Sequence, residues 1–202
     1  MSLAALFPKA LSLALAWSLL SLSFAAWPAG GVAHTLQDDA GGYEAKAKFL
    51  VNAPVFVDWP DSTFKSPTSP LQICVHGDFS FGTTLAELTR TETIKGHRME
   101  VKWARKEEEL PGCQLLFVSH SAARRYDKIL EAVKNSTTLT VGEEPTFLKA
   151  GGMVELEGSP GKLWFDVNLD AVREGHLRLS AQLLSLARHV IQRDARGEAA
   201  KS

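Results

Sequence analysis

The sequence predicts an α/β fold: a single layered domain with a largely parallel sheet, flanking helices, and a C-terminal β-hairpin followed by a helix. Two observations predict this class. Strand-like apolar runs alternate with helix-like segments along the 202-residue chain, which is the order found in parallel α/β domains. Residues 113–119 are apolar at nearly every position, as expected of a central strand that is buried on both faces.

The chain begins like an exported protein. Lys9 is the only charged residue among the first 33, and an apolar run broken only by serines covers residues 10–26. Small residues offer cleavage after Ala25 or Ala33. We therefore expect residues 1–33 to be a cleaved signal peptide and residues 34–202 to form one periplasmic domain. An uncleaved membrane anchor and a cytoplasmic apolar tail are the alternatives.

The N-terminal half is expected to start with a disordered segment over residues 34–41. Apolar residues then recur at helical spacing from Tyr43 to Trp59, and Pro54 is expected either to kink that helix or to start a second turn. Residues 61–70 are rich in Ser, Thr and Pro and indicate a loop. Further strands are expected over 71–77, 97–104 and 138–141, and helices over 81–90 and 121–135, the latter with Ser121 as its N-cap.

The C-terminal part is expected to be a hairpin and a long helix. Residues 153–157 and 162–168 flank a Gly-Ser-Pro-Gly turn and indicate two paired strands. Residues 171–192 indicate a helix with a break near Gly175, whose apolar stripe includes Val190 and Ile191. Strand alternation places Trp103 and Trp164 in the core rather than on the surface.

Cys74 and Cys113 are the two cysteines of the sequence, and both lie in the expected exported domain. A pair of cysteines in such a compartment most simply forms one disulfide. Two free buried thiols, or a metal pair with His76 or His97, are the alternatives, but no tight Cys/His spacing supports a metal. We expect neither a metal nor a cofactor.

Polar residues gather where the expected parallel strands end. His76 and Asp78 follow one strand, and Ser119, His120 and Ser121 follow another. Because ligands of such folds bind at the carboxyl edge of the sheet, His76, Asp78, Ser119 and His120 form a candidate ligand pocket. Solvated loop residues are the plainer alternative.

Catalysis and nucleic-acid binding are both disfavoured. The sequence has no Gly-x-Ser-x-Gly elbow, and the Gly-x4-Gly segment that starts at Gly77 lacks the lysine of a phosphate loop. Loss of Lys9 would leave 21 basic and 23 acidic residues, a net charge of −2. That balance argues against nucleic acid as a partner, since nucleic-acid binding needs clustered Lys and Arg.

Several segments together resemble the YfiR family of small exported bacterial proteins. The likeness covers roughly Tyr43 to Ala187, and it depends on the order and spacing of short motifs. These are Phe49-Leu50, Trp59-Pro60, Cys74 with Gly77-Asp78, Cys113, Gly151 to Met153, Phe165 to Asn168, and Ser180 to Ala187. The best-described member has a second disulfide near the Gly-Gly-Met segment, and this chain has no cysteines there.

The resemblance implies a regulator rather than an enzyme. Such a protein sits in the periplasm and binds the periplasmic part of an inner-membrane diguanylate cyclase or another membrane sensor, which keeps cyclic-di-GMP low. A stand-alone periplasmic protein that binds a small ligand is the alternative function, and a homodimer is left open. We expect the partner surface on the C-terminal block, at Glu155, Glu157, Ser180 and Gln182, with the two glutamates facing outward.

Overall fold

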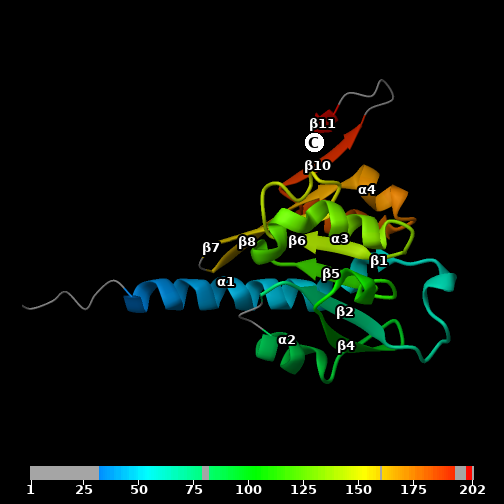
Figure 1. The fold of residues 1–202 in the computed structure, drawn as a ribbon, viewed down its shortest axis with the longest axis horizontal. Coiled ribbons are helices and arrows are strands. Elements are labelled where there is room, and N and C mark those ends of the chain that lie inside the picture. Colours follow the sequence, from blue (N-terminus) through cyan, green and yellow to red (C-terminus); the bar gives the residue numbers. More distant parts are fainter. Residues whose placement is uncertain (1–31, 79–81, 160, 194–198, 202) are drawn as a thin grey trace, which may run out of the picture.

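The computed structural model describes residues 32–78, 82–159, 161–193 and 199–201, with side chains from Gly42 to Arg193. Most of the predicted signal peptide, residues 1–31, lies outside the described residues. A nine-stranded sheet forms the centre of the domain, and helices cover both of its faces (Figure 1). None of the helices in the described ranges is both long enough and apolar enough to cross a bilayer.

The main sheet has the strand order β11-β10-β8-β7-β6-β5-β2-β4-β3. Strands β4, β2, β5, β6 and β7 run parallel, whereas β8 pairs antiparallel with β7 as a hairpin. This arrangement confirms the predicted fold class. The strands are β1 Val57–Asp58, β2 Leu71–His76, β3 Thr93–Ile94, β4 His97–Ala104, β5 Leu115–Val118, β6 Leu139–Gly142, β7 Val154–Ser159, β8 Lys162–Asn168, β9 Arg178–Leu179, β10 His189–Arg193 and β11 Ala199–Lys201.

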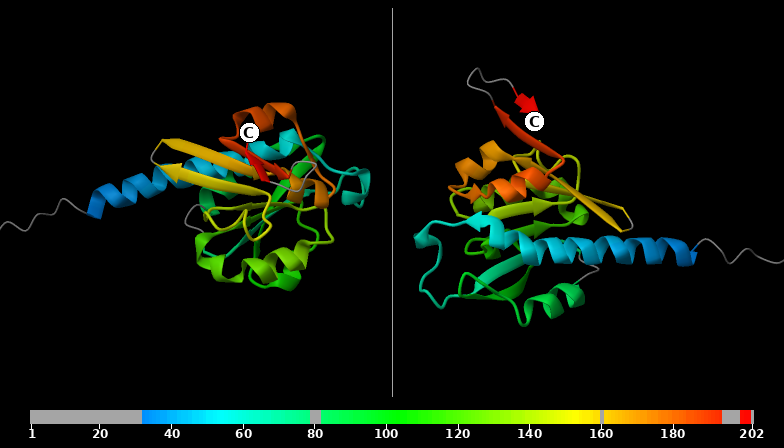
Figure 2. Two further views of the ribbon diagram at one scale, coloured as in Figure 1. Left: turned by 90° about the horizontal axis from the view of Figure 1, so that it is seen from above. Right: turned by 180° about the vertical axis from the view of Figure 1, so that it is seen from behind.

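Five α-helices and four 3₁₀ helices are described. The α-helices are α1 Val32–Asn52, α2 Gly82–Thr89, α3 Tyr126–Val133, α4 Leu169–Glu174 and α5 Ala181–Leu186. The 3₁₀ helices are η1 Ala53–Phe56, η2 Asp61–Thr63, η3 Glu107–Glu109 and η4 His120–Arg125. Seen from above, α1 and α3 lie on opposite sides of the sheet (Figure 2).

Each face of the sheet has its own apolar core. The first core packs α1, α2 and α5 against side chains such as Ile73, Phe117, Leu156 and Phe165. The second core packs η4 and α3 against Cys74, Leu116 and Val118, which alternate to the other face. Strand β5 contributes to both cores with all four residues buried, so the prediction of a central strand is confirmed.

The N-terminal helix differs from the prediction at both ends. Residues 34–41, expected to be disordered, continue α1, because extending a formed helix costs little once residues 43–52 provide its nucleus. The α-helix ends at Asn52, just before Pro54, and η1 takes over. Val57 and Asp58 then form β1, which pairs with β9, instead of a last helical turn.

The predicted break near Gly175 is present, but the prediction that the helix resumes and continues to Gln192 is wrong. Helix α4 ends at Glu174 with Gly175 as its C-cap, and His176 has a left-handed φ of 57°, so the chain turns there. After α5 the backbone becomes extended, and β10 pairs parallel with β8. The β-branched Val190 and Ile191 suit this strand, although their spacing also fitted a helical stripe.

Two smaller expectations are also wrong. Residues 120–125 form 3₁₀ helix η4 before α3, and Ser121 caps no helix; its hydroxyl accepts the Asp78 N–H instead. Trp103 and Trp164 lie on strands but are 37% and 38% exposed, because neither strand surface is fully covered at their positions. Alternation gives the face on which a side chain lies, but it does not show whether another layer covers that face.

A disulfide joins Cys74 in β2 to Cys113, just before β5. Both residues are buried in the second core, so the bond ties the two neighbouring central strands beneath α3. The predicted pairing is therefore present in the structure.

Removing this bond should destabilise the domain without changing the fold. The cysteines are 39 residues apart, and the loop-entropy relation gives about 4 kcal/mol for a loop of this length. We expect Cys74→Ala/Cys113→Ala to lower the free energy of urea unfolding by about 2–4 kcal/mol. Reductant should weaken the parent to a similar degree and leave the variant unchanged. A parent insensitive to reductant would contradict a structural role for the bond.

A polar network at the carboxyl edge of the sheet

The candidate site lies where the chain reverses the direction in which it adds strands. Strand β4 lies on one side of β2, and β5 lies on the other side, so the connection from β4 to β5 passes back over β2. The carboxyl ends of β2 and β5 therefore form a topological switch point, the usual ligand position in open α/β sheets. All four residues of the predicted pocket lie at this edge.

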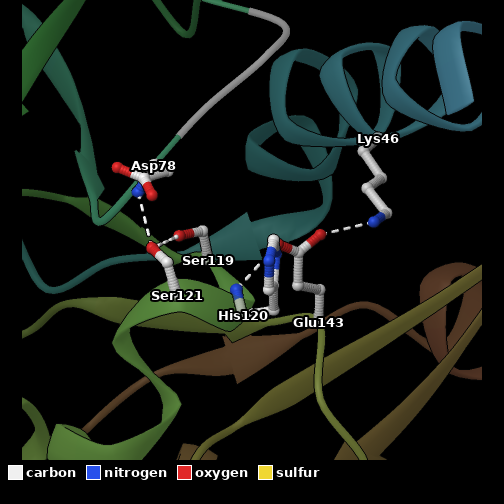
Figure 3. A network of polar contacts seen from close by, with 6 residues as sticks. All are labelled: Lys46, Asp78, Ser119, His120, Ser121 and Glu143. Carbon is white, nitrogen blue, oxygen red and sulfur yellow. Dashed lines mark hydrogen bonds and ion pairs between the residues drawn. The ribbon is translucent and has the colours of Figure 1, made fainter. Parts of the chain in front are cut away.

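The crevice between the two strand ends is filled by hydroxyl groups. Gly77 has φ +97°, and a Cβ there would lie 2.3 Å from the Ser119 hydroxyl, so the position requires glycine. The Ser121 Oγ accepts the Asp78 N–H at 2.7 Å and lies 2.9 Å from the Ser119 Oγ (Figure 3). These contacts between the ends of β2 and β5 divide the predicted pocket into two halves, one beside His120 and one beside His76.

In the half of the site beside His120, the central residue is Glu143. It follows β6, and its side chain is only 5% exposed. One carboxylate oxygen accepts the His120 backbone N–H at 2.8 Å and lies 3.4 Å from His120 Nδ1, while the other binds the Lys46 ammonium (Figure 3). One buried carboxylate therefore links the ends of β5 and β6 to helix α1.

In the other half of the site, the central residue is His76. Its ring is 1% exposed and its Nδ1 lies 2.9 Å from the Ala104 carbonyl, so Nδ1 carries the proton. Nε2 then accepts a hydrogen bond from the Arg125 guanidinium at 3.0 Å. Arg125 also pairs with Glu107 at 2.9 Å. A pocket of about 400 Å³ adjoins this pair and is lined by His76, Gly77, Asp78, Trp103, Ala104, Arg105 and Arg125.

The structure therefore places His76 and Asp78 on one side, His120 on the other, and Ser119 fully buried between them. Sequence reasoning missed Lys46, Arg125 and Glu143. Glu143 could have been found, since it follows a predicted strand as Ser119 does. Lys46 and Arg125 come from helices, and only the packing of those helices brings them to this edge.

A second polar cluster holds the C-terminal strands together. The Arg188 guanidinium binds Asp166 through two bonds of 3.0 and 2.7 Å and reaches Glu157 at 2.6 Å. The His189 N–H also donates to Asp166 at 3.1 Å. Burial on its own would raise the pKa of Asp166, but the hydrogen bonds from Arg188 and His189 outweigh it and hold that pKa below its usual range. This cluster fixes β10 beside β8.

The expectation that Glu155 faces outward is wrong. Glu155 is only 8% exposed, and the Leu148 backbone donates a hydrogen bond to its carboxylate. Burial raises the pKa of Glu155. Of the other expected partner residues, Glu157 and Gln182 are exposed, while the half-buried Ser180 caps α5 by accepting the Leu183 N–H.

These expected partner residues do not form one surface. Val154 and Leu156 of β7 point into the first core, so Glu155 and Glu157 lie on the opposite face. Helix α5 packs into the first core through Leu183 and so belongs to the other layer. In the described ranges, no group of three or more His, Cys, Asp and Glu residues is arranged to hold a metal ion.

Residues 43–188 match the YfiR/HmsC-like family. The chain belongs to this family. The matched segment contains β2 to β8, both halves of the site, and Asp166 and Arg188 of the C-terminal cluster. YfiR/HmsC-like proteins form a regulatory family, broadly of periplasmic proteins in cyclic-di-GMP signalling. The search among curated proteins found no match.

Solved structures with a related fold are distant in sequence. A conserved domain protein from Vibrio cholerae superposes with a TM-score of 0.51 at 11% identity, over 74% of this chain. An ABC domain from Streptococcus pneumoniae, crystallised in complex with L-Trp, gives a TM-score of 0.46 at 10% identity over the same share. This YfiR/HmsC-like chain spans 60% of the length of each of those chains. The first likeness supports the fold alone.

Loss of the Glu143 carboxylate should release α1 from the sheet edge. Glu143→Ala would leave the Lys46 ammonium and the His120 N–H without their acceptor, so we expect a loss of about 2–4 kcal/mol. Hydrogen exchange should rise over residues 43–52 more than in β5. Glu144→Ala removes the neighbouring carboxylate and is the control. Equal effects of the two variants would contradict the assigned role.

Glu155 should make stability depend on pH. Because burial raises the pKa of Glu155, the folded chain keeps a proton that the unfolded chain releases near pH 4.5. The free energy of unfolding therefore falls as the pH rises from about 4.5 through the folded-state pKa. Glu155→Gln keeps a carbonyl acceptor and removes this cost. We expect the variant to be more stable than the parent at neutral pH, with the difference shrinking toward acid pH.

Urea unfolding across this pH range measures the difference, and Glu87→Gln, at an exposed position of α2, is the control. A stability difference for Glu155→Gln that stays constant with pH would contradict the assignment.

Proposed function

We propose that this chain is a periplasmic protein that binds the periplasmic part of an inner-membrane signalling protein and represses a diguanylate cyclase. The observation that carries the proposal is the family match over residues 43–188, which covers the folded domain almost completely. Binding would hold the cyclase inactive and keep cyclic-di-GMP low, and the chain would act by contact rather than by turnover.

A surface on α5 and η1 suits such a contact. The Ser180 N–H donates to the Phe56 carbonyl at 2.9 Å, which ties the start of α5 to η1. These two elements carry Leu186 and Val55, which are 65% and 47% exposed. The exposed Gln182 lies on the same helix as Leu186. Exposed apolar side chains with polar neighbours are typical of an interface centre and its rim.

The experiment uses cells that lack the chromosomal copy of this protein and express variants of it. We expect deletion to raise cyclic-di-GMP and biofilm formation, and wild-type protein to restore repression. Leu186→Asp should fail to repress, because a buried charge without a partner opposes binding. Its melting temperature should stay near that of the wild type, since the side chain is exposed in the free domain.

Glu157→Lys is the comparison on the opposite face of the sheet, and because Glu157 also binds Arg188, only a variant with a wild-type melting temperature is compared. If Glu157→Lys relieves repression and Leu186→Asp does not, the partner surface lies on the hairpin rather than on α5. Unchanged cyclic-di-GMP after deletion would overturn the proposed function itself. Cross-linking from Gln182→Cys to a membrane protein then identifies the partner.

A further inference from the structure

We propose that the pocket beside Arg125 binds a small organic or inorganic anion through a carboxylate or phosphate group. It lies at the carboxyl ends of β2 and β4, next to the switch point of the sheet. The site is separate from the α5 surface and goes beyond the proposed function, which does not require a ligand.

Two contacts hold the Arg125 guanidinium in a defined orientation, although its side chain is 46% exposed. His76 is oriented by the Ala104 carbonyl and presents its unprotonated Nε2 to Arg125. Glu107 binds another nitrogen of Arg125 from the side. Two of the five N–H groups of Arg125 are thereby engaged, and the remaining N–H groups stay available for a ligand. Holding a long side chain in this way removes the entropic cost of ordering it on binding.

The charges of the lining favour an anion. Arg105 and Arg125 contribute two guanidinium groups and Asp78 one carboxylate, while Glu107 pairs with Arg125 from outside the lining. Among the described residues, Arg105 forms no side-chain ion pair, and Glu109 accepts its backbone N–H only, so the Arg105 guanidinium is available to an anion. The planar fork of arginine matches carboxylate and phosphate oxygens in two parallel hydrogen bonds.

The volume restricts the ligand to a small molecule. About 400 Å³ accommodates a metabolite-sized anion but not a folded partner. Trp103 is part of the lining and is 37% exposed, so an apolar ring or chain attached to the anionic group would contact its indole.

The test is titration of the full-length chain, with its disulfide intact, with inorganic phosphate and separately with succinate. Nitrogen-detected NMR follows the Arg125 Nε–H and Arg105 Nε–H resonances. We expect saturable shifts with at least one anion at millimolar concentration or below. Shifts with phosphate alone identify a phosphate site, and shifts with succinate alone identify a carboxylate site.

Arg125→Gln should weaken binding at least about tenfold, the scale of one lost charge-assisted hydrogen bond. Arg124→Gln is the control, because Arg124 is the neighbouring exposed arginine and, unlike Arg125, does not line the pocket. Arg105→Gln is a second variant that leaves the His76 contact intact, and it should also weaken binding. Circular dichroism and melting temperature establish that each variant is folded.

Absence of saturable shifts with both anions would overturn the proposal. So would equal weakening by Arg124→Gln and Arg125→Gln, since that result indicates attraction by net charge alone. Neither outcome bears on repression of the cyclase, because that proposal is tested by Leu186→Asp on a different surface.

Discussion

The fold depends on burying the central parallel strands on both faces. Strand β5 has no exposed side, so it needs a helical layer above and another below, and α1 and α3 supply them. Polar residues gather at the ends of these strands, where Ser119, His120 and Glu143 follow β5 and β6. Buried polar groups there must find partners in the helices, since water does not reach them. The network around Glu143 follows from this constraint.

The same constraint explains which parts of the fold the sequence predicts. The buried strands, the β7–β8 hairpin and the disulfide follow from continuous apolar runs, a Gly-Ser-Pro-Gly turn and a cysteine pair. The C-terminal helix was mispredicted because Val190 and Ile191 satisfy helical spacing and strand propensity alike. Asp166 decides between them, since its carboxylate binds Arg188 and the His189 N–H and holds that segment along β8. Such a contact spans about twenty residues and leaves no local periodic signal.

The sequence predicts those residues of the candidate site that follow strands, but not those that helices contribute. His76, Asp78, Ser119 and His120 follow strands, and the rule for parallel sheets places strand ends at one edge. The rule does not include side chains delivered by helices, so Lys46 and Arg125 were missed. It also does not show how the strand ends pack. The close approach of Gly77 to Ser119 fills the space between the ends of β2 and β5. The pocket therefore lies beside the ends of β2 and β4.

A continuous series of contacts joins the proposed anion pocket to the proposed partner surface. Helix η4 begins at His120 and ends at Arg125. The His120 N–H donates to Glu143, whose carboxylate also binds Lys46 of α1. Helix α1 continues into η1, whose Phe56 carbonyl accepts the Ser180 N–H at the start of α5. Continuity alone does not make a site allosteric, because coupling requires an element with two arrangements that both ligands bias. Within this series, the Glu143 carboxylate is the polar link between the two helical layers. Removal of that carboxylate would therefore break the polar connection between η4 and α1.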